Sequence, residues 1–378
     1  PPLRRVPAVA PLAAAALAAC AVLGAFAAPA SAAPPAIVLP TRTVTLENGL
    51  RVVLAPDRSS PTISIAVYVD VGSRDEAVGR TGFAHLFEHM MFQGSANMAK
   101  GEYFHHITRN GGTMNGTTNV DRTNYFATLP SDRLENFENQ REVVKEERRL
   151  RVDNVPYTPA RLAHAELAYE NFAYAHSVIG SMDDLDAAPL DDVQAFFDTW
   201  YTADNIVLGL AGDFDEDEAL LLVQAWFGTL RRGPGRAPVV IDEPALTEIR
   251  SQTIDDALAP EAAAYLSWQI PPSDHADTPA LMLLGYVLAG GESSRLHRRL
   301  VRDEEIALRV SAGPGGRRGP DLFNIEATAR SVDGERLRAV TLDEVARLVG
   351  DGVDDREVNA ARQRVYRERV GQLESTLG

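Results

Sequence analysis

The residues of this chain best suited to chemistry form one short run, His85-Leu86-Phe87-Glu88-His89. On a helix, the two histidines stand one turn apart on one face, and Glu88 lies on the same side. Two imidazoles at this spacing can hold a metal ion while the carboxylate reaches a neighbouring water. A packed pair of helix histidines is the alternative, but burying both beside a glutamate without a metal is costly. The run therefore predicts a metal centre.

The composition limits which metal ion and which partners the chain is expected to bind. Cys20, the single cysteine, lies in an N-terminal apolar run, so the remaining chain offers no thiolate ligand. Two histidines, a carboxylate and an open position suit zinc better than manganese or cobalt. The net charge of −16 provides no basic field for phosphates, so nucleic acid is not an expected partner.

Alternating strands and helices must position this run. A buried helix is predicted over 82–92, between two groups of strands, and a long charged helix is expected from Ser131 to about Asp153. The strand predictions rest on β-branched residues, alternation and the turn Asn48-Gly49. Before the predicted linker the expected strands are 44–55 (a hairpin), 62–71, 113–129 (a pair) and 206–211. The predicted helices are 101–109, 161–172, 190–200 and 217–227.

The second half of the chain repeats this order of elements. Strands are predicted over 263–270, 306–311 and 322–329, and helices over 278–289, 292–304, 334–348 and 355–373. The repetition predicts an α+β fold of two homologous α/β-sandwich units, each a mostly antiparallel sheet with helices packed on one face. The helix over 278–289, at the repeat position of 82–92, contains no His and no Glu. Only the first unit is therefore expected to hold metal.

The predicted organisation begins with an export signal. Arg4 and Arg5 precede an apolar run, and Ala30-Ser31-Ala32 has the form of a cleavage site, which predicts an exported, periplasmic protein. A membrane anchor and lipidation at Cys20 are the alternatives. The expected divisions are a signal peptide (1–32), a zinc-binding catalytic domain (33–235), a linker (236–250) and a non-catalytic domain that is expected to be incomplete at its C-terminus (251–378).

Several segments resemble the M16 family, which includes the pitrilysin, insulin-degrading and mitochondrial-processing peptidases. The central segment is Arg80–Ser95, RTGFAHLFEHMMFQGS, and the likeness is greatest to exported bacterial members. The resemblance covers nearly the whole chain after the predicted signal peptide. Further matching segments are Gly111–Gly116 (GGTMNG), Asp121–Tyr125 (DRTNY), Gln140–Arg149 (QREVVKEERR), Asp153–Tyr157 (DNVPY), Ala211–Phe214 (AGDF) and, in the second half, Gly290–Leu296 (GGESSRL).

The resemblance implies a third zinc ligand on the long charged helix. The family motif places this glutamate at Glu147, which lies on a helical stripe with Gln140 and Val144. Glu146 lies on a rival stripe and stays open as the alternative. A second family glutamate that assists the site corresponds to Gln140, which cannot carry charge.

One spacing departs from the family. His89 and Glu147 are 147 − 89 = 58 residues apart, whereas the family usually has about twenty residues more, enough for roughly 30 Å of helix. The shortening falls between Pro130 and Phe137. Zinc requires ligand distances of about 2.0–2.2 Å, so a displaced Glu147 would break the centre.

The resemblance implies a zinc-dependent endopeptidase, a hydrolase that cleaves peptides or unfolded segments bound in extended form. Glu88 would be the catalytic base, and His85, His89 and Glu147 would bind Zn²⁺. Asn115 and Gly116 would contact substrate at a strand edge, and a tight turn at Asn-Gly is the alternative. A second M16 half, another subunit or a copy of the chain would close a chamber. The alternative is an inactive M16-like subunit that serves as a binding or scaffold partner.

The other histidines are expected to have no metal role. His105 and His106 are adjacent on a helix and point to different faces. His164, His275 and His297 are isolated, which favours solvated or capping roles. His176 matches a family loop but is not a ligand there.

Overall fold

The computed structural model describes residues 39–92, 102–130, 155–234 and 240–372. The chain forms two compact units. The first unit contains Ala36–Asp153 and Phe172–Val239, and the second contains Asn154–Asn171 and Val240–Gly371. Each unit combines helices with its own sheet, so the predicted α+β class with two related halves is confirmed.

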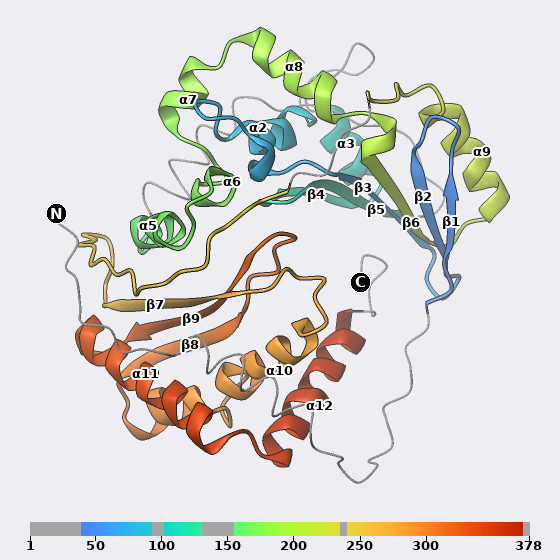
Figure 1. Ribbon diagram of the computed structural model, residues 1–378. Coiled ribbons are helices and arrows are strands. Elements are labelled where there is room, and N and C mark those ends of the chain that lie inside the picture. Colours follow the sequence, from blue (N-terminus) through green and yellow to red (C-terminus); the bar gives the residue numbers. More distant parts are fainter. Residues whose placement is uncertain (1–38, 93–101, 131–154, 235–239, 373–378) are drawn as a thin grey trace. The chain divides into compact units, whose positions relative to one another are not determined.

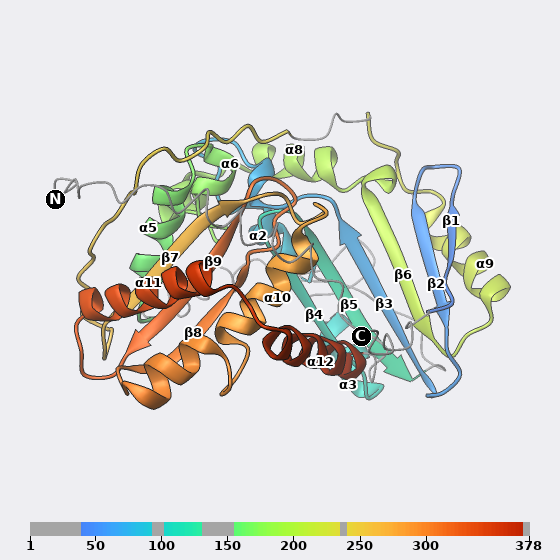
Figure 2. The same cartoon turned by 60° about the horizontal axis from the view of Figure 1, so that its bottom comes forward.

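The first unit is built on a six-stranded mixed sheet with the order β1-β2-β6-β3-β5-β4. Neighbouring strands run antiparallel except for β2 and β6, which are parallel. Figure 2 shows these strands side by side, with β4 at one edge. Their bounds are β1 (Arg42–Thr45), β2 (Arg51–Pro56), β3 (Thr62–Val69), β4 (Thr113–Thr118), β5 (Thr123–Pro130) and β6 (Ile206–Gly212).

Alternation along the strands produces one apolar face. Leu54, Ile63, Tyr125 and Leu208 point into the same core and are almost fully buried. The predicted turn at Asn48-Gly49 joins β1 to β2, and Gly49 adopts a φ of +93° that other residues rarely tolerate. Burial of these large side chains is the main force that holds the sheet to its helices.

Helices cover this apolar face, with α2 (Phe83–Met90) and α8 (Leu190–Trp200) lying over the sheet in Figure 1. The predicted helices over 82–92, 101–109, 190–200 and 217–227 are present with small shifts at their ends. The predicted helix over 131–153 lies outside the described residues. The remaining helical elements are η1 (Ser73–Asp75), α3 (Glu102–Arg109), α6 (Phe172–Ala175), α7 (Met182–Ala187), η3 (Ala203–Asn205) and α9 (Glu216–Phe227).

The second unit contains a three-stranded antiparallel sheet with the order β7-β9-β8. Its core lies between this sheet and helices that include α10 and α11. In place of the predicted helix over 292–304, a π-helix occupies His297–Asp303. The bounds are β7 (Ala263–Ile270), α10 (Thr278–Ala289), β8 (Ala307–Pro314), β9 (Asp321–Ala329), α11 (Gly334–Asp351) and α12 (Asp355–Gln372).

One helix of the first half of the sequence belongs to the second unit. α5 (Thr158–Ala168) contacts β7, and His164 Nε2 lies 3.0 Å from Ser267 Oγ. Ser267 alternates with the core residues of β7, so α5 covers the sheet face opposite α10 and α11. The sequence places 154–171 within a domain over 33–235, whereas Asn154–Asn171 group with the second unit by their contacts; the predicted domain division stays a prediction.

The other predicted divisions concern the N-terminus and the linker. Residues 1–32 lie outside the described residues, so the signal peptide stays a prediction. The described part of the linker, 240–250, contains neither helix nor strand. Among the described helices, none combines the length and apolar character needed to span a membrane.

Candidate metal centre

His85, Glu88 and His89 come together on α2. The Nε2 atoms of His85 and His89 lie 3.1 Å apart, and their rings meet edge to face at 87°. One ligand atom from each of the three residues falls within 4.8 Å of the others. Tetrahedral zinc with Zn–N bonds of about 2.0 Å requires two nitrogen ligands about 3.3 Å apart. The two Nε2 atoms, 3.1 Å apart, therefore need to move only slightly apart to bind zinc.

Glu88 is buried against strand β4. Glu88 is only 9% exposed, and its Oε2 accepts a 2.7 Å hydrogen bond from Thr118 Oγ1. A Cβ added at Gly116 would lie 2.9 Å from Glu88 Cγ and 3.2 Å from Oε1. Glycine at this position lets α2 approach the strand closely, and Thr118 fixes the orientation of the carboxylate.

The opposite side of α2 is anchored by aromatic packing. Phe87 stacks on Phe196 of α8 with ring centroids 5.1 Å apart. Tyr125 of β5 donates a 3.2 Å hydrogen bond to the carbonyl of Phe87 and lies 2.7 Å from the hydroxyl of Tyr201. Burial raises the pKa of both tyrosines, so they stay neutral donors. The helix that carries the site is thus held on two sides.

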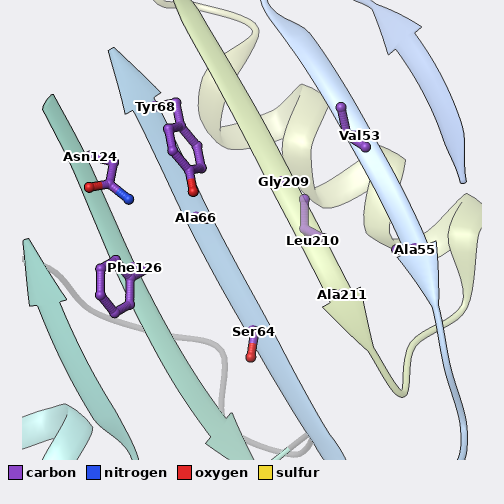
Figure 3. A pocket seen from close by; sticks show the side chains of 10 residues that line it. All are labelled: Val53, Ala55, Ser64, Ala66, Tyr68, Asn124, Phe126, Gly209, Leu210 and Ala211. Atoms are coloured by element: carbon purple, nitrogen blue, oxygen red, sulfur yellow. The ribbon is translucent and has the colours of Figure 1, made fainter. Parts of the chain in front are cut away.

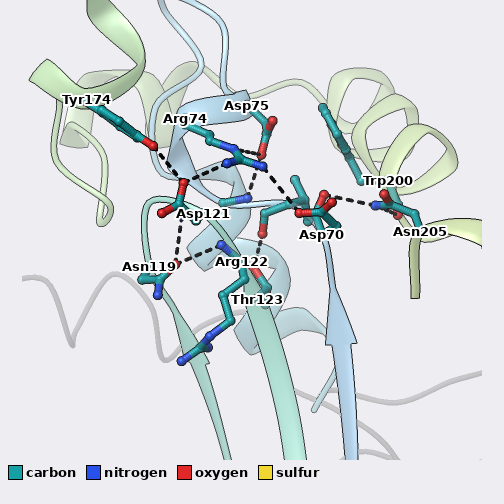
Figure 4. Close-up of polar contacts among 12 residues, drawn as sticks. Asp70, Arg74, Asp75, Asn119, Asp121, Arg122, Thr123, Tyr174, Trp200 and Asn205 are labelled. Atoms are coloured by element: carbon teal, nitrogen blue, oxygen red, sulfur yellow. Dashed lines mark hydrogen bonds and ion pairs between the residues drawn. The ribbon is translucent and has the colours of Figure 1, made fainter. Parts of the chain in front are cut away.

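A polar network fixes the β4–β5 connection, which directly follows the part of β4 with Gly116 and Thr118. The Arg74 guanidinium donates a 2.8 Å hydrogen bond to Asp121, and Tyr174 of α6 donates to the same carboxylate at 2.9 Å. Asp121 also belongs to a turn in which Asn119 Oδ1 accepts its backbone N–H. Figure 4 shows Arg74 among these partners and Asp70 and Asp75. The network ties β4 and β5 to η1, which precedes α2.

The predicted substrate residues lie on β4, at an edge of the sheet. Asn115 is exposed, whereas Gly116 is buried against Glu88, so successive residues of the strand face opposite sides. The predicted third ligand, Glu147, and its alternative, Glu146, lie outside the described residues. Gln140 and the shortened segment after Pro130 lie there as well.

Sequence reasoning missed Thr118, the tyrosine pair and Glu76. Thr118 follows Gly116 by two positions on a predicted strand, so alternation could have placed both toward Glu88. The sequence contains no such signal for Tyr201, because its partner Tyr125 is distant in sequence. It contains none for Glu76 either, because this carboxylate accepts from a backbone amide, that of Gly82.

A shallow hollow of about 280 Å³ lies elsewhere on the first unit. Figure 3 shows it on the sheet face whose residues include Ser64, Tyr68 and Phe126. These residues alternate with those that face α2, so the hollow opens on the other side of the sheet from Glu88. We assign it no part in the metal centre.

The sequence and the fold match the M16 peptidases. A family model described as "Insulinase (Peptidase family M16)" matches residues 51–146. One described as "Peptidase M16 inactive domain" matches residues 187–365. The two models together account for most of the sequence, and this chain belongs to the M16 family.

Several relatives are named as proteases. Zinc protease PqqE of Helicobacter pylori is 30% identical over 289 residues, which are 70% of this chain and 64% of that protein. The chain thus spans less than two thirds of this relative's length. A probable mitochondrial-processing peptidase subunit beta of Arabidopsis thaliana is 27% identical over 368 residues, covering 89% of this chain and 68% of the relative.

Solved structures share the architecture. The crystal structure of a protease from Helicobacter pylori superposes with a TM-score of 0.83 at 26% identity, covering 90% of this chain and 87% of that one. A structure described as a peptidase M16 inactive domain from Pseudomonas fluorescens has a TM-score of 0.73 and 19% identity, with 89% and 86% covered. The second likeness concerns the fold alone.

Proposed function

We propose that this chain is a zinc-dependent endopeptidase that cleaves peptides or unfolded segments bound in extended form. The observation that carries the proposal is the convergence of two histidine Nε2 atoms, 3.1 Å apart, beside the buried carboxylate of Glu88. The zinc protease names of several relatives agree with it.

His85 and His89 would hold the ion, with Glu147 as the proposed third ligand. Bound zinc supplies a Lewis acid that polarises the scissile carbonyl and lowers the pKa of water to about 7. Glu88 takes the proton of the attacking water and passes it to the leaving amine. The 2.7 Å hydrogen bond from Thr118 fixes the Glu88 carboxylate, which would then face the attacking water.

Substrate would bind along β4. This strand lies at the end of the strand order, and its backbone can pair with an extended peptide. Gly116 brings this strand against Glu88, and exposed Asn115 can contact the peptide from the other face. A second M16 half, another subunit or a copy of the chain would close the chamber.

We also propose export to the periplasm, on the basis of the basic start, the apolar run and Ala30-Ser31-Ala32. Lipidation at Cys20 is the variant of this proposal in which the protein stays attached to a membrane.

The second candidate function is an inactive M16-like subunit. Two observations favour it, the 58-residue interval between His89 and Glu147 and the uncharged Gln140. An inactive partner would use the same fold to bind a second subunit without turnover.

The two candidates differ in the effect of Glu88→Gln. For an enzyme, the substitution leaves the metal bound and lowers kcat by about 100-fold or more, because the base no longer accepts a proton. The assay is cleavage of quenched fluorescent peptides, with metal content measured on the same samples. Glu292→Gln, at an exposed carboxylate of the second unit, is the matched control. Equal cleavage by the wild type and Glu88→Gln would remove the assignment of Glu88.

A further inference from the structure

The N-terminus of α2 has no capping side chain of its own. The residue at the N-cap is Gly82, in a left-handed conformation with a φ of +89°, and no side-chain cap bond is present at this position. The first amide groups of a helix have no partner within the helix, so buried ones require acceptors from elsewhere. His85 follows only three residues after Gly82.

Glu76 supplies those acceptors. Its Oε2 accepts a hydrogen bond from the amide of Gly82, and its Oε1 accepts one from the amide of Ala84, both at 2.8 Å. The side chain is fully buried. A carboxylate here also opposes the positive end of the helix dipole. Glu76 is therefore a cap supplied from η1, the segment before the helix.

His176 provides the counter-charge for Glu76. Its Nε2 lies 3.0 Å from Glu76 Oε2, and its Nδ1 lies 2.6 Å from the carbonyl of Phe172. A carbonyl only accepts, and the carboxylate already accepts two amide protons, so both ring nitrogens act as donors. With Glu76 ionised, this arrangement makes the ring an imidazolium. The ring also stacks on Phe172, with centroids 4.3 Å apart.

Backbone contacts place the segment that carries His176 against the start of α2. A Cβ added at Gly180 would lie 2.3 Å from the carbonyl oxygen of Thr81. The backbones of these two segments therefore touch with no side chain between them. The amide of Thr81 donates to Asp184 at 3.0 Å, and its hydroxyl accepts from the amide of Ser181 at 2.9 Å. This segment therefore cannot shift along α2 without breaking several hydrogen bonds.

We propose that Glu76 and His176 form a buried ion pair that caps α2 and fixes its position, which makes both of them positioning residues for the metal ligands His85 and His89. This inference rests on the proposed metal site. Loss of the pair frees the first turn of α2, and that turn leads directly into His85. Groups that orient ligands in this indirect way typically change metal affinity by about 10–100-fold.

Two readouts test the pair. The first is hydrogen exchange of the metal-free protein, followed in peptides that cover residues 76–92. Glu76→Gln and His176→Gln should both raise the exchange rate of the Gly82 and Ala84 amides, with Glu76→Gln having the larger effect. The second is zinc affinity from competition with a chromogenic chelator, which should weaken by about tenfold or more in each variant.

A matched control breaks a comparable ion pair in the second unit. Glu357 accepts hydrogen bonds of 2.6 and 2.7 Å from Arg295, and both side chains are mostly buried. Glu357→Gln should leave zinc affinity and exchange of the 76–92 region at wild-type values. His176→Gln keeps both Glu76 backbone bonds available, so it remains informative if Glu76→Gln fails to fold.

The double variant Glu76→Gln/His176→Gln shows whether the two residues act as one unit. The loss of zinc affinity in the double variant should be smaller than the sum of the losses in the two single variants. Wild-type zinc affinity and unchanged exchange in both single variants would overturn the inference. A wild-type protein that binds no zinc would overturn the proposed function instead, and amide exchange would then decide whether the pair caps α2.

Discussion

The helices α2 and α10 occupy the same place in the repeated order of elements, yet they are held in different ways. α10 buries Leu281, Val287 and Leu288 and carries no His or Glu. α2 buries Phe83 and Phe87 on one side, but its other side presents two histidines and a buried carboxylate. Apolar packing suffices for α10, whereas α2 needs polar partners around it.

The start of each helix shows the same contrast. α10 has Pro279 in its first turn, which removes one amide that would otherwise need an acceptor. α2 has no proline there, and the buried carboxylate of Glu76 accepts from two of its amides. The capping of α2 thus comes from Glu76 in the segment just before the helix, and Glu76 is in turn held by His176, 100 residues further along the chain.

The largest effect on folding is expected from Leu281→Ala in α10. Truncation of this buried side chain should lower the free energy of unfolding by about 2–5 kcal/mol through lost burial and a cavity. Chemical denaturation measures this loss, and zinc binding by the folded fraction should be unchanged. A matching fall in zinc affinity would break the contrast between an apolar helix and a site-bearing helix.

A smaller effect, confined to turnover, is expected from Thr118→Val. Valine keeps the branched shape but removes the hydroxyl that donates to Glu88. kcat/KM should fall about tenfold, which corresponds to about 1.4 kcal/mol, while zinc stays bound. Thr113→Val, at an exposed position of the same strand, is the control. Wild-type kcat/KM in Thr118→Val would show that the hydroxyl does not orient the base.

The smallest effect is a pH dependence of stability that involves His176. Burial disfavours its charge, but hydrogen bonds to Glu76 and to the carbonyl of Phe172 outweigh burial and raise the pKa of His176 above 6.5. Among the residues that the structure describes, the charged group in contact with His176 is the carboxylate of Glu76. The stabilisation is fully present below pH 6.5, the ordinary pKa, and is lost as the pH rises through the higher folded-state pKa.

The measurement compares metal-free wild type with His176→Gln by denaturation from about pH 6 to about pH 9, the range around an imidazole pKa. The stability advantage of the wild type should shrink toward the alkaline end. An advantage that stays constant or grows with pH would contradict an imidazolium at this position.

Sequence reasoning worked best where the signal is local. The helix with His85, Glu88 and His89, the turn at Asn48-Gly49 and the apolar helix over 278–289 all follow from periodicity or turn chemistry, and the structure contains each of them. The helix over 161–172 is present as α5 with shifted ends, but its weak apolar pattern does not reveal that His164 and its neighbours pack on β7.

Other features of the structure could not be predicted from the sequence, because they depend on contacts between distant segments or on very short helices. Glu76 and His176 are 100 residues apart, and nothing in either segment marks them as a pair. The short helices α6 and α7 were not predicted, because each has too few residues for a helical period to emerge. The domain division, the substrate residues and Glu147 remain predictions.

Zinc content per chain shows whether α2 carries a metal centre. The sample is the chain from Ala33 onward, dialysed against zinc and then against metal-free buffer, with His85→Ala and Glu88→Gln prepared in parallel. We expect about one zinc per chain in the wild type and in Glu88→Gln, and little in His85→Ala, because only the histidine is a ligand. A folded wild-type protein without zinc, or equal zinc in His85→Ala, would contradict the account.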